Sequence, residues 1–254
     1  MYFDSHAHLD ATRFNDDRQE ILEDLKNHGV TRIMNVGCDL VSSERSVALA
    51  EAYDFIYASV GSHPDDADHV DGKLLDHYRQ LASHPKVRAI GEIGLDYHYE
   101  DVPRGQQIIA FEEQIELAEA LKLPAIVHMR EATEDVMTIV KRHPDLRGVF
   151  HCFSGSADLA RWLVDRGWYL GFTGVVTFKN ARRALEAVEA IPIDRILIET
   201  DCPYMAPEPY RGRRNDSRLV PLVAKKIAEL KGLTPEEMGL QTAQNANTLF
   251  GIAE

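Results

Sequence analysis

Four histidines and two carboxylates recur at comparable places in the chain, each beside the end of a short apolar run. These residues are His6, His8, Glu92, His128, His151 and Asp201. Imidazole and carboxylate groups bind zinc and manganese, and carboxylates also bind magnesium. Six ligands exceed what one tetrahedral ion needs. The set therefore predicts two divalent ions per chain (Zn, Mg or Mn) that share a carboxylate and activate a hydroxide as nucleophile.

Each of these residues has a simpler interpretation when it is taken alone. A His-x-His pair such as His6 and His8 is common in loops, and Glu92 could be an ordinary surface residue. Residues two apart on a strand share a face, however, so both imidazoles can point toward one ion. The recurrence of the pattern favours the metal site. Asp4 and Glu199 lie two residues before His6 and Asp201, and they could orient the metal ligands without binding the ion themselves.

Three further residues are candidates for binding substrate phosphate. His63 precedes Pro64 and could instead shape a turn. Arg130 could clamp a phosphate with two hydrogen bonds or form a salt bridge within the protein. Arg211 opens the basic stretch at residues 211–214, which could contact phosphate or be a solvated loop.

Short apolar runs, rich in β-branched residues, alternate with longer amphipathic segments. The runs lie at residues 2–4, 32–36, 55–60, 87–90, 125–127, 149–150, 169–172 and 196–198, and terminal helices are expected at 219–230 and 235–250. Such alternation is typical of the α/β class with parallel strands. Eight repeats predict a single (β/α)8 TIM-type barrel domain over residues 1–254. In such barrels the site lies at the C-terminal ends of the strands.

Composition limits the classes of function. The net charge of −13 argues against a broad surface for polyanions, although it allows a local one. Cys38, Cys152 and Cys202 are odd in number and widely spaced, which predicts a reduced, cytoplasmic protein. We expect Cys152 and Cys202 to be packing residues. The sequence shows neither a signal-peptide pattern nor an apolar run near the ~20 residues that span a membrane. No obligate protein partner is evident.

The chain resembles the TatD family of metal-dependent hydrolases, and within it the YcfH-like members. The motifs that carry the resemblance lie at residues 3–10, 61–64, 91–96, 124–130, 151–155 and 198–204. The resemblance implies an amidohydrolase-type barrel and deoxyribonuclease activity, of a 3′-to-5′ exonuclease or repair type, with DNA as a transient partner. It also implies one metal held by His6, His8, Glu92 and Asp201, and the other held by Glu92, His128 and His151.

One loop departs from the family pattern. Many relatives carry Asn-Glu-Pro or Asn-Gln-Pro where this chain has Asn215, Asp216 and Ser217. The missing proline affects the conformation of the loop and hence substrate preference, but it does not change the metal ligands.

The preferred hypothesis is hydrolysis of a phosphodiester bond by a metal-activated hydroxide, with Glu92 and Asp201 as catalytic residues. Asp201 is the expected proton shuttle. A small-molecule amidohydrolase that cleaves an ester, lactone or cyclic amide with the same metal core is the first alternative, because this fold hosts many chemistries. A non-catalytic protein that kept the metal for structure is the second. The basic residues 211–214 distinguish the two enzyme hypotheses, because a nuclease is expected to use them to bind phosphate.

Overall fold

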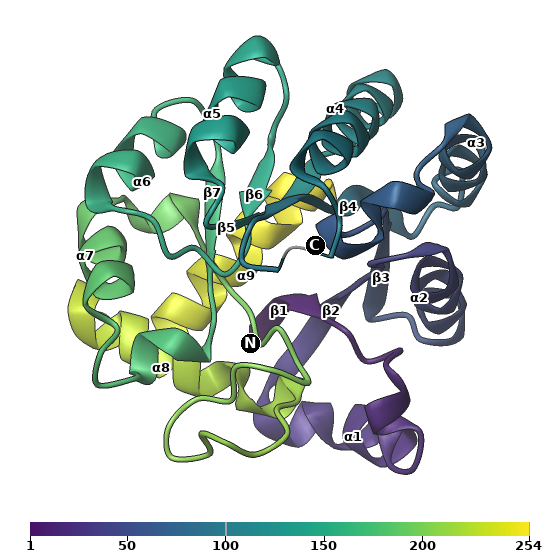
Figure 1. The fold of residues 1–254 in the computed structure, drawn as a ribbon. Coiled ribbons are helices and arrows are strands. Elements are labelled where there is room, and N and C mark those ends of the chain that lie inside the picture. The colour runs from purple at the N-terminus through teal and green to yellow at the C-terminus, as the bar shows by residue number, and fades with distance from the viewer. Residues whose placement is uncertain (100, 254) are drawn as a thin grey trace. The chain divides into compact units, whose positions relative to one another are not determined.

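The computed structural model describes residues 1–99 and 101–253, and in these residues strands and helices alternate as the sequence predicts. Eight strands, β1 to β8, are each followed by one or more helices (Figure 1). The chain divides into two compact units. We call Met1–Asn35 with Cys152–Glu254 the terminal unit, and Val36–His151 the central unit. A single domain over residues 1–254 stays a prediction.

The central unit is a parallel sheet whose strands follow chain order. Its strands are β3 (Ile56–Val60), β4 (Val87–Asp96), β5 (Ala125–Arg130) and β6 (Gly148–Phe150). Its helices are α2 (Leu40–Ala52), α3 (Gly72–Leu81), α4 (Arg104–Leu121), α5 (Thr133–Arg142) and the 3-10 helix η3 (Pro64–His69). Figure 1 shows α2, α3 and α4 outside β3 and β4, so these helices cover one face of the sheet.

Local sequence signals explain where helices of the central unit begin. Asp39 caps α2 in a reciprocal capping box with Ser42, and Asp71 accepts hydrogen bonds from two backbone N–H groups of α3. These side chains satisfy amides that the first turn of a helix leaves without partners. The helices therefore begin where the sequence offers an aspartate.

A glycine lets β4 and β5 approach closely beside the site. Gly94 pairs with His128, and a Cβ on Gly94 would lie 2.0 Å from the carbonyl oxygen of His128. The φ of 148° at Gly94 is also a conformation that other residues rarely adopt. Gly94 therefore fixes the backbone that carries His128.

The terminal unit pairs β1 (Tyr2–Ala7) with β2 (Val30–Val36), which ends one residue past the unit boundary, and β7 (Tyr169–Phe172) with β8 (Ile196–Ile198). Its α-helices are α1 (Arg18–Asp24), α6 (Ala157–Val164), α7 (Arg182–Ala190), α8 (Val220–Lys231) and α9 (Pro235–Phe250). Its 3-10 helices are η1 (Thr12–Phe14), η2 (Leu25–His28), η4 (Gly174–Thr177), η5 (Ile193–Arg195) and η6 (Ser217–Leu219).

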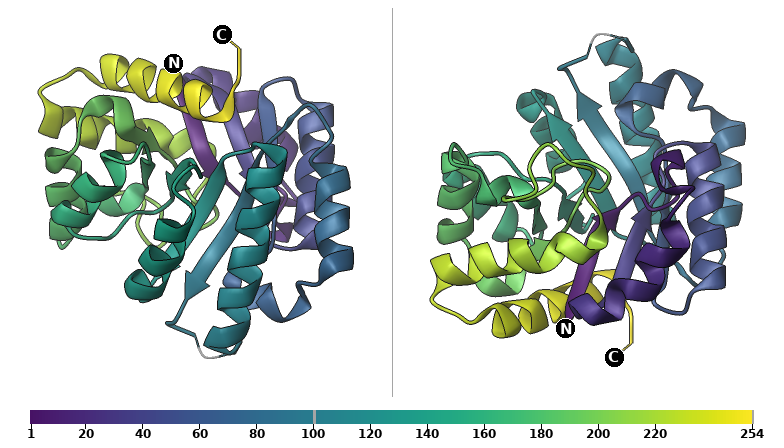
Figure 2. Two further views of the ribbon diagram at one scale, coloured as in Figure 1. Left: turned by 90° about the horizontal axis from the view of Figure 1, so that it is seen from above. Right: turned by 90° about the horizontal axis from the view of Figure 1, so that it is seen from below.

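Helix α9 packs across the strands of the terminal unit. Phe250 contacts Phe3 of β1, with ring centroids 6.1 Å apart. Asn245 donates hydrogen bonds of 2.8 Å to the carbonyl oxygens of Ile193 and Ile196, just before and within β8. Figure 2 shows α8 and α9 side by side in both views. The C-terminal helix thus links β1 and β8, the strands that lead to His6 and Asp201.

Three strands extend further than the apolar runs indicated. β1, β4 and β5 continue to Ala7, Asp96 and Arg130, so His6, Glu92, His128 and Arg130 lie within strands and not after them. The reason is that ladder hydrogen bonds continue past the first polar residue, as the pairing of Asp96 with Arg130 shows. The expected starts of β2, β3 and β6 were also off by one or two residues.

Candidate metal centre

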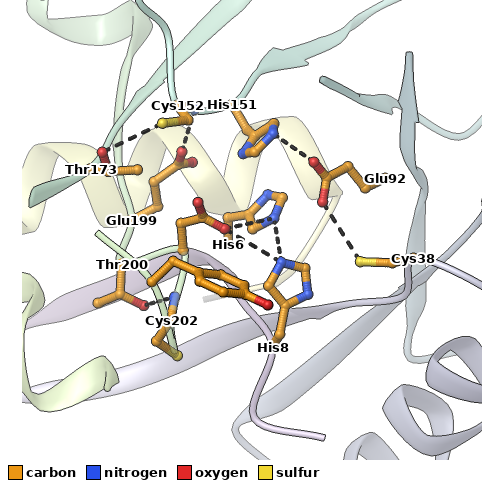
Figure 3. A network of polar contacts seen from close by, with 12 residues as sticks. His6, His8, Cys38, Glu92, His151, Cys152, Thr173, Glu199, Thr200 and Cys202 are labelled. Carbon is orange, nitrogen blue, oxygen red and sulfur yellow. Dashed lines mark hydrogen bonds and ion pairs between the residues drawn. The ribbon is translucent and has the colours of Figure 1, made fainter. Parts of the chain in front are cut away.

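His6, His8 and Asp201 come together in the terminal unit, and we call them the terminal group. The Nε2 atoms of His6 and His8 lie 3.1 Å apart, and Asp201 Oδ1 lies 3.8 Å and 3.4 Å from them, respectively. Figure 3 shows the rings of His6 and His8 turned toward each other. His6 is fully buried, and His8 and Asp201 are each only 9% exposed.

Backbone pairing places the terminal group. The Asp201 N–H donates to the His6 carbonyl at 2.9 Å, and the His8 N–H donates to the Cys202 carbonyl at 2.9 Å. Asp201 has a φ of 53°, in the left-handed region that costs a non-glycine residue free energy. The segment after β8 is therefore bonded to the end of β1, which brings Asp201 to the histidines.

Asp4 and Glu199 make the contacts that an orienting residue would make. Asp4 is fully buried and accepts hydrogen bonds from the Thr200 N–H at 2.9 Å and from its hydroxyl at 2.6 Å. Burial raises the pKa of Asp4 to about 6, although these hydrogen bonds oppose the shift. Glu199 accepts a hydrogen bond of 2.6 Å from the Cys152 N–H. Both carboxylates thus hold backbone next to a predicted ligand.

Glu92, His128 and His151 come together in the central unit, and we call them the central group. Glu92 Oε1 lies 2.8 Å from His128 Nδ1 and 2.7 Å from His151 Nε2. The two histidine nitrogens are themselves 3.1 Å apart. Figure 3 shows His151 pointing at Glu92, which is only 3% exposed. Three donor atoms therefore converge on one point.

Asp96 is a member of this neighbourhood that the sequence analysis missed. It ends β4, is 2% exposed, and its Oδ2 lies 3.1 Å from His128 Nε2. Burial opposes a charge on His128, but hydrogen bonds with Asp96 and Glu92 outweigh it and raise the pKa of His128 to about 9. Asp96 lies four residues past Glu92 on the same strand. Because side chains two or four residues apart on a strand share a face, this spacing could have identified Asp96.

His63 has the turn-shaping role that the sequence allowed, and its contact with substrate phosphate stays a prediction. It caps η3, and its Nδ1 accepts a hydrogen bond of 3.2 Å from the Asp65 N–H, so it does shape the turn. Its Nε2 also lies 3.7 Å from Glu92 Oε1, and its ring contacts that of His128 at 4.5 Å. His63 therefore borders the central group.

The arginines differ in their exposure and in their contacts with other residues of the protein. Arg130 Nη1 lies 3.8 Å from Asp96 Oδ2, yet 43% of its side chain is exposed. Arg211 is exposed and stacks over the Phe178 ring at 4.3 Å. Arg214 forms a two-pronged ion pair with Asp17. Within the basic stretch at 211–214, Arg214 is therefore a structural residue, and phosphate binding by Arg211 stays a prediction.

The loop that departs from the family pattern is firmly anchored. Asn215 is buried and donates hydrogen bonds to the carbonyls of Thr200 at 2.8 Å and Tyr204 at 2.7 Å. Asp216 caps η6 and pairs with Arg218. The asparagine and aspartate thus hold the loop beside Asp201 without the proline.

The cysteines, all within the described residues, form no disulfide. Cys202 is buried, and burial raises the pKa of its thiol to about 12, as suits a packing residue. Cys152 is half-buried, with its sulfur 3.6 Å from Thr173 Oγ1. Cys38 was not assigned a role, yet its sulfur lies 3.7 Å from Glu92 Oε2 (Figure 3).

The donor atoms of both units fit a divalent ion. In each unit one trio of ligand atoms lies within 4.8 Å, namely His6, His8 and Asp201, and His63, Glu92 and His128. Ligands about 2.0–2.2 Å from a tetrahedral zinc are about 3.4 Å from each other. The separations of 3.1–3.8 Å in the terminal group match this spacing. Those of the central group are somewhat shorter, at 2.7–3.1 Å.

Comparisons with known proteins agree with this fold and chemistry. The crystal structure of YjjV, a TatD homologue from Escherichia coli K12, matches with a TM-score of 0.92 and 30% identity over 99% of this chain and 98% of that one. The metal-dependent hydrolase YabD of Bacillus subtilis (strain 168) is 47% identical over 99% of this chain and all of that protein. The chain is thus a metal-dependent hydrolase of the (β/α)8 TIM-type class, as predicted.

The family is equally clear. The model for TatD-related DNases matches residues 3–251, so the chain belongs to this family, as its motifs indicated. A further relative, from Pantoea vagans (strain C9-1), is 35% identical over 99% of this chain and the whole of that protein. It is named a 3′-5′ ssDNA/RNA exonuclease, TatD.

Proposed function

We propose that this protein is a deoxyribonuclease that cleaves phosphodiester bonds with two divalent ions, acting as a 3′-to-5′ exonuclease or in repair. The observation that carries the proposal is the presence of one group of histidine and carboxylate ligands in each unit. The name of the Pantoea relative supports a nucleic-acid substrate. DNA is then a transient partner, and the cytoplasmic location expected from the cysteines belongs to the same proposal.

Different residues of the protein bind the ions and transfer the proton. The terminal group and the central group each hold an ion, and Glu92 as the ligand shared by both stays a prediction from the sequence. When bound, such ions lower the pKa of water and stabilise charge on phosphoryl oxygens. Asp201 is 9% exposed, so its carboxylate can accept the proton of the attacking water. The water oxygen then forms a new P–O bond, the P–O bond to the leaving nucleotide breaks, and Asp201 returns its proton to the leaving oxygen.

Exposed cationic side chains supply the substrate contacts. Arg130 lies over the ring of Tyr99 at 5.1 Å, and Arg211 lies over that of Phe178 at 4.3 Å. Stacking limits the motion of each guanidinium but leaves N–H groups for phosphate. These two arginines add positive charge to a strongly acidic chain, and His63 is a third candidate contact.

The direct test is hydrolysis of a 5′-labelled single-stranded DNA by metal-stripped protein, with Mg²⁺, Mn²⁺ or Zn²⁺ added back separately. Glu92→Gln is the control, because it keeps the side chain's shape and removes its charge. We expect metal-restored cleavage that shortens the strand stepwise and falls about a thousandfold in the variant. Metal-loaded protein that cleaves no DNA, but hydrolyses esters, lactones or cyclic amides, would replace this proposal with the small-molecule hydrolase.

A further inference from the structure

We propose that Asp96 is a positioning residue that fixes the tautomer of His128 and so makes Nδ1 the metal-binding nitrogen. The inference rests on the proposed metal centre and deepens it. It concerns how the central group is prepared for an ion, and all of the residues that carry it lie in the central unit.

The two nitrogens of His128 face different partners. Nε2 lies 3.1 Å from Asp96 Oδ2, while Nδ1 lies 2.8 Å from Glu92 Oε1 and 3.1 Å from His151 Nε2. A neutral imidazole carries its proton on one nitrogen and a lone pair on the other. A carboxylate only accepts, so Asp96 retains the proton on Nε2. An ion held by Glu92 and His151 would displace the proton on Nδ1, and the lone pair of Nδ1 would then face that ion.

Asp96 is itself held in one orientation. Its N–H donates to Gln107 Oε1 at 2.9 Å, and its Oδ1 accepts a hydrogen bond of 2.8 Å from the His98 N–H. Gln107 is fixed in turn by a hydrogen bond of 3.0 Å to the Val102 carbonyl. With Oδ1 committed to His98, Oδ2 is the oxygen presented to His128.

The same geometry predicts an unusual result for Asp96→Asn. The His98 N–H requires an oxygen opposite it, so the carbonyl of the asparagine will take the place of Oδ1. The amide NH₂ must then face His128 Nε2 and donate to it. His128 is driven to the opposite tautomer, in which a proton occupies Nδ1 and blocks the metal-binding position.

If Asp96 had a purely structural role, the loss of metal binding in Asp96→Asn and Asp96→Ala would rank in the opposite order. Asparagine preserves the volume of Asp96, whereas alanine leaves a cavity and should be more harmful if packing is all that matters. In the positioning account, Asp96→Ala imposes no wrong tautomer. It should therefore weaken metal binding less than Asp96→Asn does.

The experiment measures metal affinity by calorimetry with Mn²⁺ and Zn²⁺, and the His128 tautomer by NMR of ¹⁵N-histidine-labelled, Zn²⁺-loaded protein. We expect one ion to bind about 10–100-fold more weakly in Asp96→Asn and less weakly in Asp96→Ala. We also expect His128 to carry its proton on Nε2 in Zn²⁺-loaded wild type, and on Nδ1, which then does not bind zinc, in Asp96→Asn. Asp135→Asn is the matched control, because Asp135 accepts a hydrogen bond from Tyr97 and should leave both readouts unchanged.

Unchanged affinity and tautomer in Asp96→Asn, or a larger loss of affinity in Asp96→Ala, would overturn the inference. Neither readout uses DNA. Failure of the wild-type protein to cleave DNA would therefore count against the proposed nuclease alone.

Discussion

Two arginines of the basic loop, three residues apart, have different surroundings. Arg211 is exposed, with its guanidinium over the Phe178 ring, and is available to a substrate. Arg214 pairs with Asp17 and also donates to the Arg13 carbonyl at 2.6 Å. The first is placed to bind, and the second fastens the loop to the segment that precedes α1.

These surroundings predict separate consequences for the same substitution. Arg211→Gln should weaken DNA binding and reduce the slope of log affinity against log salt by about 0.7, the effect of one phosphate contact on a single strand. Arg214→Gln should leave that slope unchanged and lower Tm by about 2–4 °C, since a solvent-exposed ion pair is worth at most about 1 kcal/mol. Salt titrations and thermal melts measure the two effects. Equal salt slopes in wild type and Arg211→Gln would remove Arg211 from the substrate contacts.

At this scale the sequence pointed to candidate metal ligands, which the structure brings together within each unit, and to Asp4 and Glu199 behind them, but not to Asp96. Each ligand lies near the end of an apolar run, a pattern that spacing makes visible. The φ of 53° at Asp201 and the approach of Asp96 to His128 depend on backbone geometry and on neighbouring strands. Local spacing places Asp96 on the same face of the strand as Glu92, but it shows neither the contact with His128 nor the backbone conformation of Asp201.

At the scale of elements, helix α9 begins with a complete capping box. The Thr234 hydroxyl accepts from the Glu237 N–H at 3.2 Å, and Glu237 Oε2 accepts from the Thr234 N–H at 2.8 Å. Pro235 occupies the first helical position, where its missing N–H costs nothing. These signals explain why the predicted bounds 235–250 agree with the observed helix.

Thr234→Val should therefore lower the free energy of unfolding by about 1 kcal/mol, because valine keeps the shape and removes the capping oxygen. Thr234→Ser keeps the oxygen and should stay within a few tenths of a kcal/mol of wild type. Urea denaturation measures both values. If the two variants were equally stable, the capping bond would contribute nothing.

Strand ends were harder to predict than this helix. The apolar run at 87–90 indicated a short strand, whereas β4 continues to Asp96. Its last residues pair with β5, and Gly94 lets the two strands meet at His128. Pairing with a partner strand set the true end, and a single sequence does not display its partners.

At the scale of the whole molecule, each of the two compact units carries one set of candidate ligands. Within the described residues no helix is both long and apolar enough to cross a membrane. The net charge of −13 adds attraction for cations to the chemistry of the ligands.

Ions that bind only the folded protein must stabilise it. At an ion concentration about 100 times Kd, one bound ion adds about 3 kcal/mol, which corresponds to about 5–10 °C in Tm. Thermal melts of stripped and reloaded protein should show this increase in wild type and no increase in the double variant His6→Ala/His128→Ala. A Tm that chelation leaves unchanged would show that the ions contribute nothing to the folded state.

We propose that the terminal group and the central group are the metal ligands of the hydrolase. Elemental analysis of stripped, reloaded and desalted protein counts the ions that these groups hold. We predict two ions per chain in wild type, and one in each of the single variants His6→Ala and His128→Ala, with hydrolysis lost in both. If both variants kept the wild-type number of ions, the two groups would not be the metal ligands.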